Sequence, residues 1–467
     1  AEQVPEYDFF FTPNDLQAQQ WNLQKINAEL SWDFSQGSSN VIVAIVDDAI
    51  LLSHQDLSSK IWINTNEIPM NGIDDDGNGF IDDINGWDAA DNDNDPNPFN
   101  PTNSSFTHGT HCAGISASAT NNNVGISSIG FNTTIMPVKI AQSSTHTLTG
   151  SYIGVQYAII NNANVISMSW GGSGYSSTFQ ALFDFAYSKG ITCIAAAGNS
   201  NSNIPMYPAS YNHVISVGAS DLNDTKASFS NYGPTIDVMA PGVNIYSTLA
   251  GSNSSYGNLS GTSMACPLVS GLAALMISYD PSLTPDDLEQ CLKNSCNNID
   301  ALNPTYINQL GAGRINAYAA MHCLKPINAD FTSDKRQICQ GQSIQYTDLS
   351  TNNPISWQWS FPGGTPATST LQHPSVTYSS NGIYSTTLIA TNNNGTDTIT
   401  IPSFITVSNP TASMSGSTTL LSGFSANIPV FFSGVPPFNF TYSDGTSNYI
   451  VNNTISNPHY ITVNPSV

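Results

Sequence analysis

The stretch Val41-Ile42-Val43-Ala44-Ile45-Val46 decides the fold. An uninterrupted apolar run rich in β-branched residues predicts a strand that is buried on both faces of a parallel sheet. Downstream of it, predicted strands alternate with helices that we expect at 108–118, 150–161 and 179–189; the strands are expected at 135–139, 165–168, 192–196 and 214–217. This alternation predicts an α/β fold, a parallel sheet covered by helices on both faces, with sites at the carboxyl ends of the strands.

The sequence divides into three parts. Residues 1–325 are expected to form the α/β domain, with an aromatic-rich arm at its N-terminus. After Pro326 the helix patterns give way to short alternating segments separated by turn residues, which predicts an all-β sandwich over 327–408. Residues 409–467 show fewer strand patterns and predict a β-rich, incomplete immunoglobulin-like module.

The charge of the chain narrows its partners. Thirty-three acidic residues against ten basic ones give a formal net charge of −23, which argues against nucleic acid or anionic lipid as a partner. The excess acidity instead predicts bound cations. The sequence contains no apolar run of about 18 residues, so it predicts no membrane span. The first residues lack the layout of a signal peptide, and we expect a processed, secreted monomer.

The seven cysteines fall into two groups. Three lie among apolar or small residues and are expected to be buried thiols: Cys112, Cys193 and Cys266. Four lie in more polar surroundings and could form up to two disulfides by any of three pairings, among which the sequence does not choose: Cys291, Cys296, Cys323 and Cys339.

A serine in a turn before a helix is the first candidate for chemistry. Gly261-Thr262-Ser263-Met264-Ala265-Cys266-Pro267 precedes a small and apolar run. Ser263 can be a helix cap, or a nucleophile if a histidine and a carboxylate accompany it. Asp47 directly follows the Val41–Val46 strand, and His108 begins His108-Gly109-Thr110-His111 at the start of a predicted helix. Together the three residues favour nucleophilic catalysis.

These motifs carry a family resemblance. The order Asp47, His108, Ser263 is similar to that of subtilisin-like serine proteases. The resemblance covers about residues 15 to 325, and it extends to His54-Gln55-Asp56-Leu57, Ser167-Met168-Ser169-Trp170-Gly171-Gly172, Ala195-Ala196-Ala197-Gly198-Asn199 and Ala240-Pro241-Gly242. It implies that Ser263 attacks a peptide carbonyl, that His108 moves the proton, that Asp47 orients the imidazole, and that Asn199 donates to the oxyanion.

One position departs from the family pattern. Asp47 is followed by Asp48-Ala49 where the family usually has a small hydroxyl residue and glycine. Asp48 is therefore a rival for the carboxylate of the triad. We expect its side chain to point to the opposite side, because it follows Asp47 at the end of the strand.

The resemblance also implies substrate contacts. Ser169-Trp170-Gly171 matches the edge that pairs with an extended substrate backbone. Trp170 could wall a subsite for a bulky side chain or could be core packing, and Met206 is expected to narrow the primary pocket.

The acidic insertion between residues 71 and 95 predicts calcium. Asp74, Asp76, Asn78 and Asp82 take the relative positions 1, 3, 5 and 9 of an EF-hand loop, with the Phe80 carbonyl at position 7. The alternative is a solvated acidic loop. A second calcium (Ca2+) site is implied by the resemblance alone: Asp56 and Asn122, with carbonyls around Val124 and Ile126.

The module at 327–408 is similar to polycystic-kidney-disease-type (PKD) β-sandwiches. The resemblance rests on Trp357-Gln358-Trp359-Ser360-Phe361-Pro362-Gly363-Gly364, His373-Pro374, Tyr378, Gly382-Ile383-Tyr384 and Asn394-Gly395. Core packing is expected for one of the two tryptophans. An exposed aromatic residue could bind insoluble protein or polysaccharide.

The sequence as a whole therefore predicts a secreted, calcium-stabilised endopeptidase that acts on protein or peptide substrates. The alternative is a catalytically silent binding protein on the same scaffold.

Overall fold

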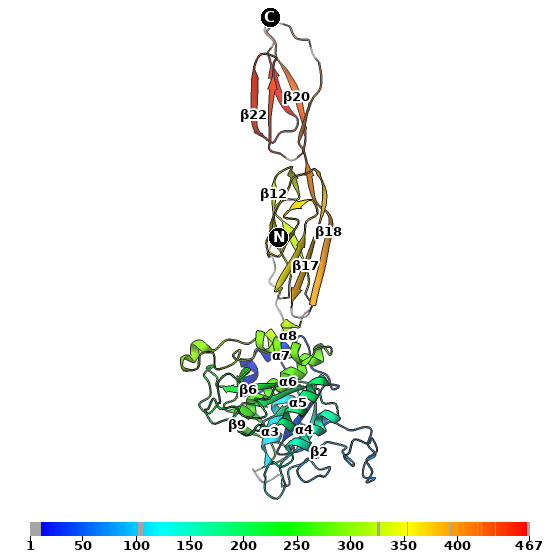
Figure 1. The fold of residues 1–467 in the computed structure, drawn as a ribbon, viewed down its shortest axis with the longest axis vertical. Helices are drawn as coiled ribbons and strands as arrows, with labels where there is room; N and C mark the ends of the chain where they lie inside the picture. Colours follow the sequence, from blue (N-terminus) through cyan, green and yellow to red (C-terminus); the bar gives the residue numbers. More distant parts are fainter. Residues whose placement is uncertain are drawn as a thin grey trace. The chain divides into compact units, whose positions relative to one another are not determined.

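A computed structural model describes residues 11–100, 106–324, 327–352, 354–392, 395–417, 419–421, 423–434 and 436–464. The first ten residues of the expected N-terminal arm lie outside these ranges. The chain forms two compact units, residues 1–324 and 325–467 (Figure 1).

The first unit is built on a seven-stranded parallel sheet with the order β2-β3-β1-β4-β5-β6-β7. The strands are β1 (Ile42–Asp47), β2 (Trp87–Asp88), β3 (Thr134–Lys139), β4 (Val165–Met168), β5 (Thr192–Ala196), β6 (Val214–Ser220) and β7 (Val238–Pro241). An antiparallel hairpin, β8 (Ile245–Leu249) and β9 (Ser255–Leu259), stands apart from this sheet.

The central strand β1 shows why its sequence is apolar throughout. Val43 and Ile45 point into one core, and Ala44 and Val46 into a second core on the other face of the sheet. Helices α3 (His108–Ala117) and α6 (Thr262–Tyr279) pack in the first core. Helices α4 (Ser151–Ile160) and α5 (Ser177–Ser188) pack in the second. The predicted α/β fold with helices on both faces is therefore confirmed.

Helix α6 is the longest helix described in the first unit. It alone among the described helices is long and apolar enough to span a membrane, yet 89% of it is buried inside this fold. Its apolar character is that of a core helix.

Four further α-helices are described in the first unit: α1 (Trp21–Lys25), α2 (Ala28–Ser31), α7 (Pro285–Asn294) and α8 (Ala317–Cys323). A disulfide joins Cys291 of α7 to Cys323 of α8, across 32 residues of sequence. Cys296 and Cys339 are free thiols, so one of the candidate bonds is formed. The three cysteines expected to be buried thiols are buried and unbonded.

The second unit begins with a β-sandwich. One sheet has the order β10-β12-β16-β14 and the other β11-β18-β17-β13-β15. The strands are β10 (Phe331–Ser333), β11 (Gln337–Cys339), β12 (Ser343–Asp348), β13 (Ser356–Ser360), β14 (Gly364–Thr365), β15 (Thr368–Ser369), β16 (Ser375–Tyr378), β17 (Gly382–Asn392) and β18 (Gly395–Ser408). Trp359 is fully buried in its core, whereas Trp357 is half-buried and donates to Asp348 Oδ2 at 2.8 Å. Asn394, part of the predicted PKD pattern, lies outside the described residues.

The last part of the chain has a smaller core. It contains a three-stranded sheet, β19 (Thr411–Met414), β20 (Ala426–Ser433) and β23 (His459–Val463), and a hairpin of β21 (Phe438–Ser443) and β22 (Asn448–Thr454). Among its described residues the buried apolar side chains are Val430, Phe438 and Ile461. Short strands around so small a core agree with the β-rich module that the sequence predicts.

Candidate active site

The carboxyl end of β1 meets the start of α3. His108 Nδ1 lies 2.7 Å from Asp47 Oδ1, so the ring N–H donates to the carboxylate of the buried Asp47. Gly109 permits this close approach, because a Cβ there would lie 2.5 Å from the Ala49 carbonyl and 2.8 Å from Asp47 Cβ. The glycine of the His108-Gly109 pair is thus required by the contact between strand and helix.

The Asp47 carboxylate changes the acidity of His108. Burial by itself lowers the pKa of His108, but the attraction and the hydrogen bond of Asp47 outweigh this effect and hold the pKa well above its ordinary value of 6.5. The side chain of His108 remains 35% exposed.

Asp48 lies beside the same helix, which corrects the expectation that it points to the opposite side. Its Oδ1 accepts from the Gly109 N–H at 2.7 Å and its Oδ2 from the His108 N–H at 3.2 Å. Thr107, the N-cap residue, makes no side-chain cap, so Asp48 satisfies the first free N–H groups of α3. Asp48 Oδ2 also lies 3.3 Å from His146 Nε2 and raises the pKa of that imidazole.

Ser263 is the second residue of α6. Its hydroxyl donates to the Ser169 carbonyl at 3.1 Å, and the Ser169 hydroxyl donates back to the Ser263 carbonyl at 2.9 Å. That carbonyl is free because Pro267, four residues later, has no N–H to donate to it. The Cys112 thiol also contacts this carbonyl. Its Sγ lies 3.4 Å from the Ser263 carbonyl oxygen and 3.9 Å from His108 Nδ1.

The buried thiol of Cys112 therefore lies where α3, which carries His108, contacts α6, which carries Ser263. Burial raises the pKa of Cys112 to about 12, so its thiol is protonated at neutral pH. The sequence predicts the burial of Cys112 but not this position, because no sequence motif marks a thiol at the contact between two helices.

Asn199 follows β5 and is held by the start of α6. Its Oδ1 accepts from the Thr262 N–H at 2.9 Å and from the Thr262 hydroxyl at 3.0 Å. Its Nδ2 faces Gly261, since a Cβ at Gly261 would lie 3.4 Å from it, and it has no hydrogen-bond acceptor among the described residues. The preceding Gly198 has φ +103°, and a Cβ there would lie 2.6 Å from Asn231 Nδ2. The backbone turn at Gly198 thus leaves the amide of Asn199 with two free donors.

The segment after β4 presents backbone groups to solvent. Gly172 pairs with Tyr207 through two hydrogen bonds of 2.7 Å. Within the described part of the chain no hydrogen bond involves the backbone of Gly171. Trp170 anchors the segment, because its indole N–H donates to the Val46 carbonyl at 2.9 Å.

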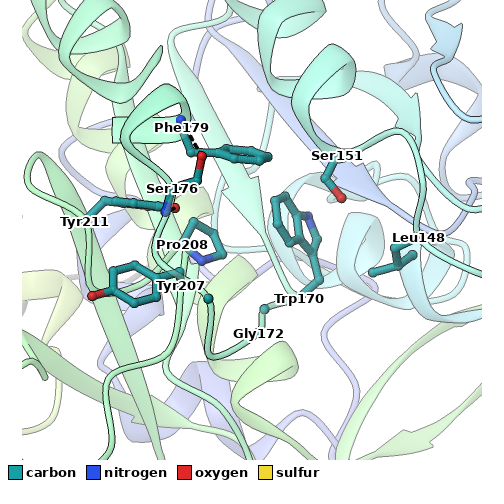
Figure 2. Close-up of a pocket in the computed structure, with 11 residues that line it drawn as sticks. Leu148, Ser151, Trp170, Gly172, Ser176, Phe179, Tyr207, Pro208 and Tyr211 are labelled. Carbon is teal, nitrogen blue, oxygen red and sulfur yellow. Dashed lines mark hydrogen bonds between the residues drawn. The ribbon is translucent and has the colours of Figure 1, made fainter. Parts of the chain in front are cut away.

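The Trp170 side chain does two things at once. Its indole packs against the second core and also lines an open hollow of about 310 Å³ (Figure 2). The other residues around this hollow are mainly apolar, and they include Leu148, Phe179, Tyr207, Pro208 and Tyr211. The packing of Trp170 is therefore observed, and its role as the wall of a substrate subsite stays a prediction.

Met206 lies elsewhere. Its Cγ is 3.2 Å from the position of a Cβ at Gly198, which places it against the turn that carries Asn199. It is not among the residues that line the hollow beside Trp170.

In the acidic insertion, side chains of the predicted calcium ligands also bind the backbone of the loop. Asp74 accepts from the N–H groups of Asn78 and Gly79, and Asp82 accepts from those of Asn71 and Gly72. The Asn78 side-chain oxygen accepts from the Phe80 N–H. The carboxylates of Asp74 and Asp82 thus hold the loop itself.

A second set of carboxylates converges instead. Oxygens of Glu67, Asp76 and Asp83 lie within 4.8 Å of one another, and this group could hold a metal ion. Glu67 and Asp83 are buried, with 5% and 0% of their surface exposed. Two unit charges at this separation repel by about 3 to 4 kcal/mol at an effective dielectric constant of about 20, so a bound cation would suit the group.

The other predicted cation site is also buried. Asn122 donates through Nδ2 to Asp56 Oδ1 at 3.0 Å, and the Ile126 N–H donates to Asp56 Oδ2 at 2.8 Å. Burial raises the pKa of Asp56 to about 6. The Val124 N–H donates to Asn122 Oδ1, so its carbonyl belongs to the same tight turn. Asp15, which the sequence does not single out, accepts from the Asn122 N–H at 2.8 Å.

Comparison with known proteins agrees with this architecture. The model of the subtilase family matches residues 38–313, and the model of the PKD domain matches residues 325–407. Thermitase of Thermoactinomyces vulgaris is 38% identical over 314 residues, which are 67% of this chain and 99% of thermitase. An extracellular protease of Xanthomonas campestris is 38% identical over 337 residues, which are 66% of this chain and 57% of that protein.

A solved structure is also similar to this chain. A protease from Pseudoalteromonas arctica is 31% identical, with a TM-score of 0.55, over 67% of this chain and 99% of that one. The chain therefore belongs to the subtilase family, the subtilisin-like serine endopeptidases, and carries a PKD domain.

Proposed function

We propose that this chain is a secreted endopeptidase that cleaves exposed polypeptides with Ser263 as nucleophile, His108 as base and Asp47 as its orienting carboxylate. The hydrogen bond of 2.7 Å between Asp47 and His108 carries the proposal. It fixes the tautomer in which Nδ1 holds the proton and Nε2 is free to accept one.

The resting hydroxyl of Ser263 donates to the Ser169 carbonyl. A substrate strand that pairs along Ser169–Gly171 brings its own N–H groups to this edge. When a substrate N–H takes the Ser169 carbonyl, the Ser263 hydroxyl turns to His108 Nε2, gives up its proton and attacks the scissile carbonyl. His108 then passes that proton to the leaving amine.

The negative charge on the attacked oxygen needs donors that are already in place. The free Nδ2 of Asn199 and the Ser263 N–H at the start of α6 supply them in this proposal. Because Thr262 holds the oxygen of the Asn199 amide twice, the amide need not reorganise as the charge develops.

We infer the substrate preference from two features, the Ser169–Gly171 segment and the hollow beside Trp170. The hollow beside Trp170 suits a bulky apolar side chain of an extended substrate, and Met206 beside Gly198 bounds the space next to Asn199. Protein substrates are therefore proposed, with a preference for large apolar residues on one side of the cleaved bond. The extracellular relative supports secretion, and the β modules are proposed to bind insoluble protein or polysaccharide.

Calcium is the proposed stabilising ion. Asp56 and Asn122 form one site, with the turn through Val124 and Ile126, and the acidic insertion forms another. The fit rests on buried carboxylates that have no cationic partner among the described residues: Asp56 and Asp83 are both fully buried. A bound cation would oppose their mutual repulsion and hold two long loops on the sheet.

The test is covalent labelling of the nucleophile. A fluorophosphonate should label the full chain once and abolish casein hydrolysis, and Ser263→Ala should remove both label and activity. Ser188→Ala, on the exposed side of α5, is the matched control and should keep both. A folded protein that takes no label and cleaves no casein would favour the catalytically silent scaffold.

A further inference from the structure

The acidic insertion contains two possible sets of metal ligands. The EF-hand spacing predicts Asp74, Asp76, Asn78, the Phe80 carbonyl and Asp82. The structure brings together a different set, in which Asp76 is joined by Glu67 and Asp83 from outside that pattern.

Two amide side chains occupy the space between these carboxylates. Asn64 Nδ2 donates to Asp76 Oδ2 at 2.9 Å and to Asp83 Oδ1 at 2.8 Å. Asn78 Nδ2 donates to Asp76 Oδ2 and Asp83 Oδ2, both at 3.2 Å. Glu67 accepts from backbone N–H groups of the loop, through Oε1 and Oε2.

A second, independent observation points to this group. The hydroxyl of Tyr157 is buried, with 0% of the residue exposed, and makes no hydrogen bond of acceptable geometry. Its ring packs under the insertion, 4.8 Å from the ring of Phe80 and 6.5 Å from that of Trp87. The Tyr157 hydroxyl lies beside the Asp83 carboxylate.

We propose that the insertion binds its divalent cation, Ca2+, through Glu67, Asp76 and Asp83, beside the hydroxyl of Tyr157, and not through the ladder from Asp74 to Asp82. The inference rests on the proposed dependence on calcium and names the residues that provide it. Among the described residues of the insertion, the carboxylate oxygens that lie within 4.8 Å of one another are those of Glu67, Asp76 and Asp83, and Asp74 and Asp82 belong to no such group.

Helix α4 connects the proposed cation site to the hollow beside Trp170. Tyr157 belongs to α4, and Ser151 at the start of α4 lines the hollow beside Trp170. A cation at this place fixes the insertion to that helix.

Terbium, which replaces calcium at oxygen sites, tests the ligand set in the full chain carrying Ser263→Ala to prevent self-digestion. The rings of Trp62 and Trp87 lie 6.5 Å from that of Tyr157, so tryptophan-selective excitation should sensitise terbium bound there. Glu67→Gln and Asp83→Asn should each weaken terbium binding about tenfold or more.

The matched controls come from the ladder. Asp74→Asn and Asp82→Asn make the same chemical change within the same insertion, and because each keeps one oxygen for the loop backbone, they should weaken terbium binding less than Glu67→Gln and Asp83→Asn do. If these two lose binding while Glu67→Gln and Asp83→Asn keep it, the ladder holds the ion and the proposal is wrong, although the dependence on calcium stands. If the parent neither binds terbium nor changes its melting temperature with a chelator, the calcium proposal itself fails.

Melting in a chelator separates ligand loss from misfolding. With chelator, Asp83→Asn should melt no lower than the parent, because one of three repelling carboxylates is gone. With calcium, the parent should gain stability and Asp83→Asn should not, measured with Asp56→Asn in both to remove the other site. Tyr157→Phe keeps the ring packing and should weaken terbium binding; parental affinity in all three variants at Glu67, Asp83 and Tyr157 would overturn the assignment.

Discussion

Replacement of Asn199 by aspartate isolates the proposed oxyanion donor. Asn199→Asp keeps an oxygen where Thr262 donates twice, at 2.9 and 3.0 Å, and replaces the free Nδ2 group by a second oxygen. The shape of the side chain and its anchor remain. Only the donor that would face the developing charge is lost, and a negative charge takes its place.

The size of the effect follows from the number of donors. Loss of one preorganised donor of this kind lowers kcat by about 10² to 10³-fold, a range measured on a subtilisin, which corresponds to about 2.7 to 4 kcal/mol of transition-state stabilisation. Because the aspartate also repels the oxyanion, Asn199→Asp should reach at least this range. KM should change little, since the donor acts mainly in the transition state.

Steady-state kinetics on peptide amides, with active sites counted by fluorophosphonate labelling, measure both constants. Thr262→Val is the matched control: it removes the hydroxyl anchor of Asn199 but keeps the N–H anchor, so its loss in kcat should be much smaller. Parental kcat in Asn199→Asp, or a loss confined to KM, would refute the role of Asn199.

Three further predictions concern acidity, stability and specificity. In the proposed mechanism the neutral imidazole of His108 is the base, so kcat/KM should rise with pH through the pKa of His108, above 6.5, and Asp47→Asn should move this limb to lower pH while reducing kcat. Cys323→Ser should lower the free energy of unfolding by about 3 to 4 kcal/mol, as expected for opening a 32-residue loop, and a parent reduced at Cys291–Cys323 should melt with the variant. Trp170→Ala should lower kcat/KM for peptides with large apolar side chains more than for those with small ones; an unchanged profile across a peptide library would assign the indole to packing alone.

The sequence predicts best those features that a single period or motif encodes. The apolar run before Asp47 allows only a strand buried on both sides, and β1 is such a strand. The pairing of Asp47 with His108 was predicted by resemblance. Its geometric reason, the absence of a Cβ at Gly109, becomes visible only when β1 and α3 lie together.

Features that depend on contacts between distant segments were not predictable in the same way. The choice of Cys323 as the partner of Cys291 depends on how α7 and α8 pack. The EF-hand spacing singled out the acidic insertion as a calcium site, but the carboxylates that converge in the structure include Glu67 and Asp83, which lie outside that pattern. Spacing along the chain does not show which carboxylates the fold brings together.

The two consecutive aspartates at the carboxyl end of β1 illustrate how one strand end positions the proposed catalytic histidine twice. Asp47 holds the ring of His108 through Nδ1, and Asp48 holds the backbone N–H of the same residue and of Gly109. A small hydroxyl residue in place of Asp48 can cap the helix but brings no charge. Asp48 adds a negative charge at the positive end of α3 and a contact to His146. Asp47 therefore orients the side chain of His108, and Asp48 fixes the start of the helix that carries His108. Mutation can separate the two functions, because Asp47 binds the imidazole of His108 and Asp48 binds its backbone N–H.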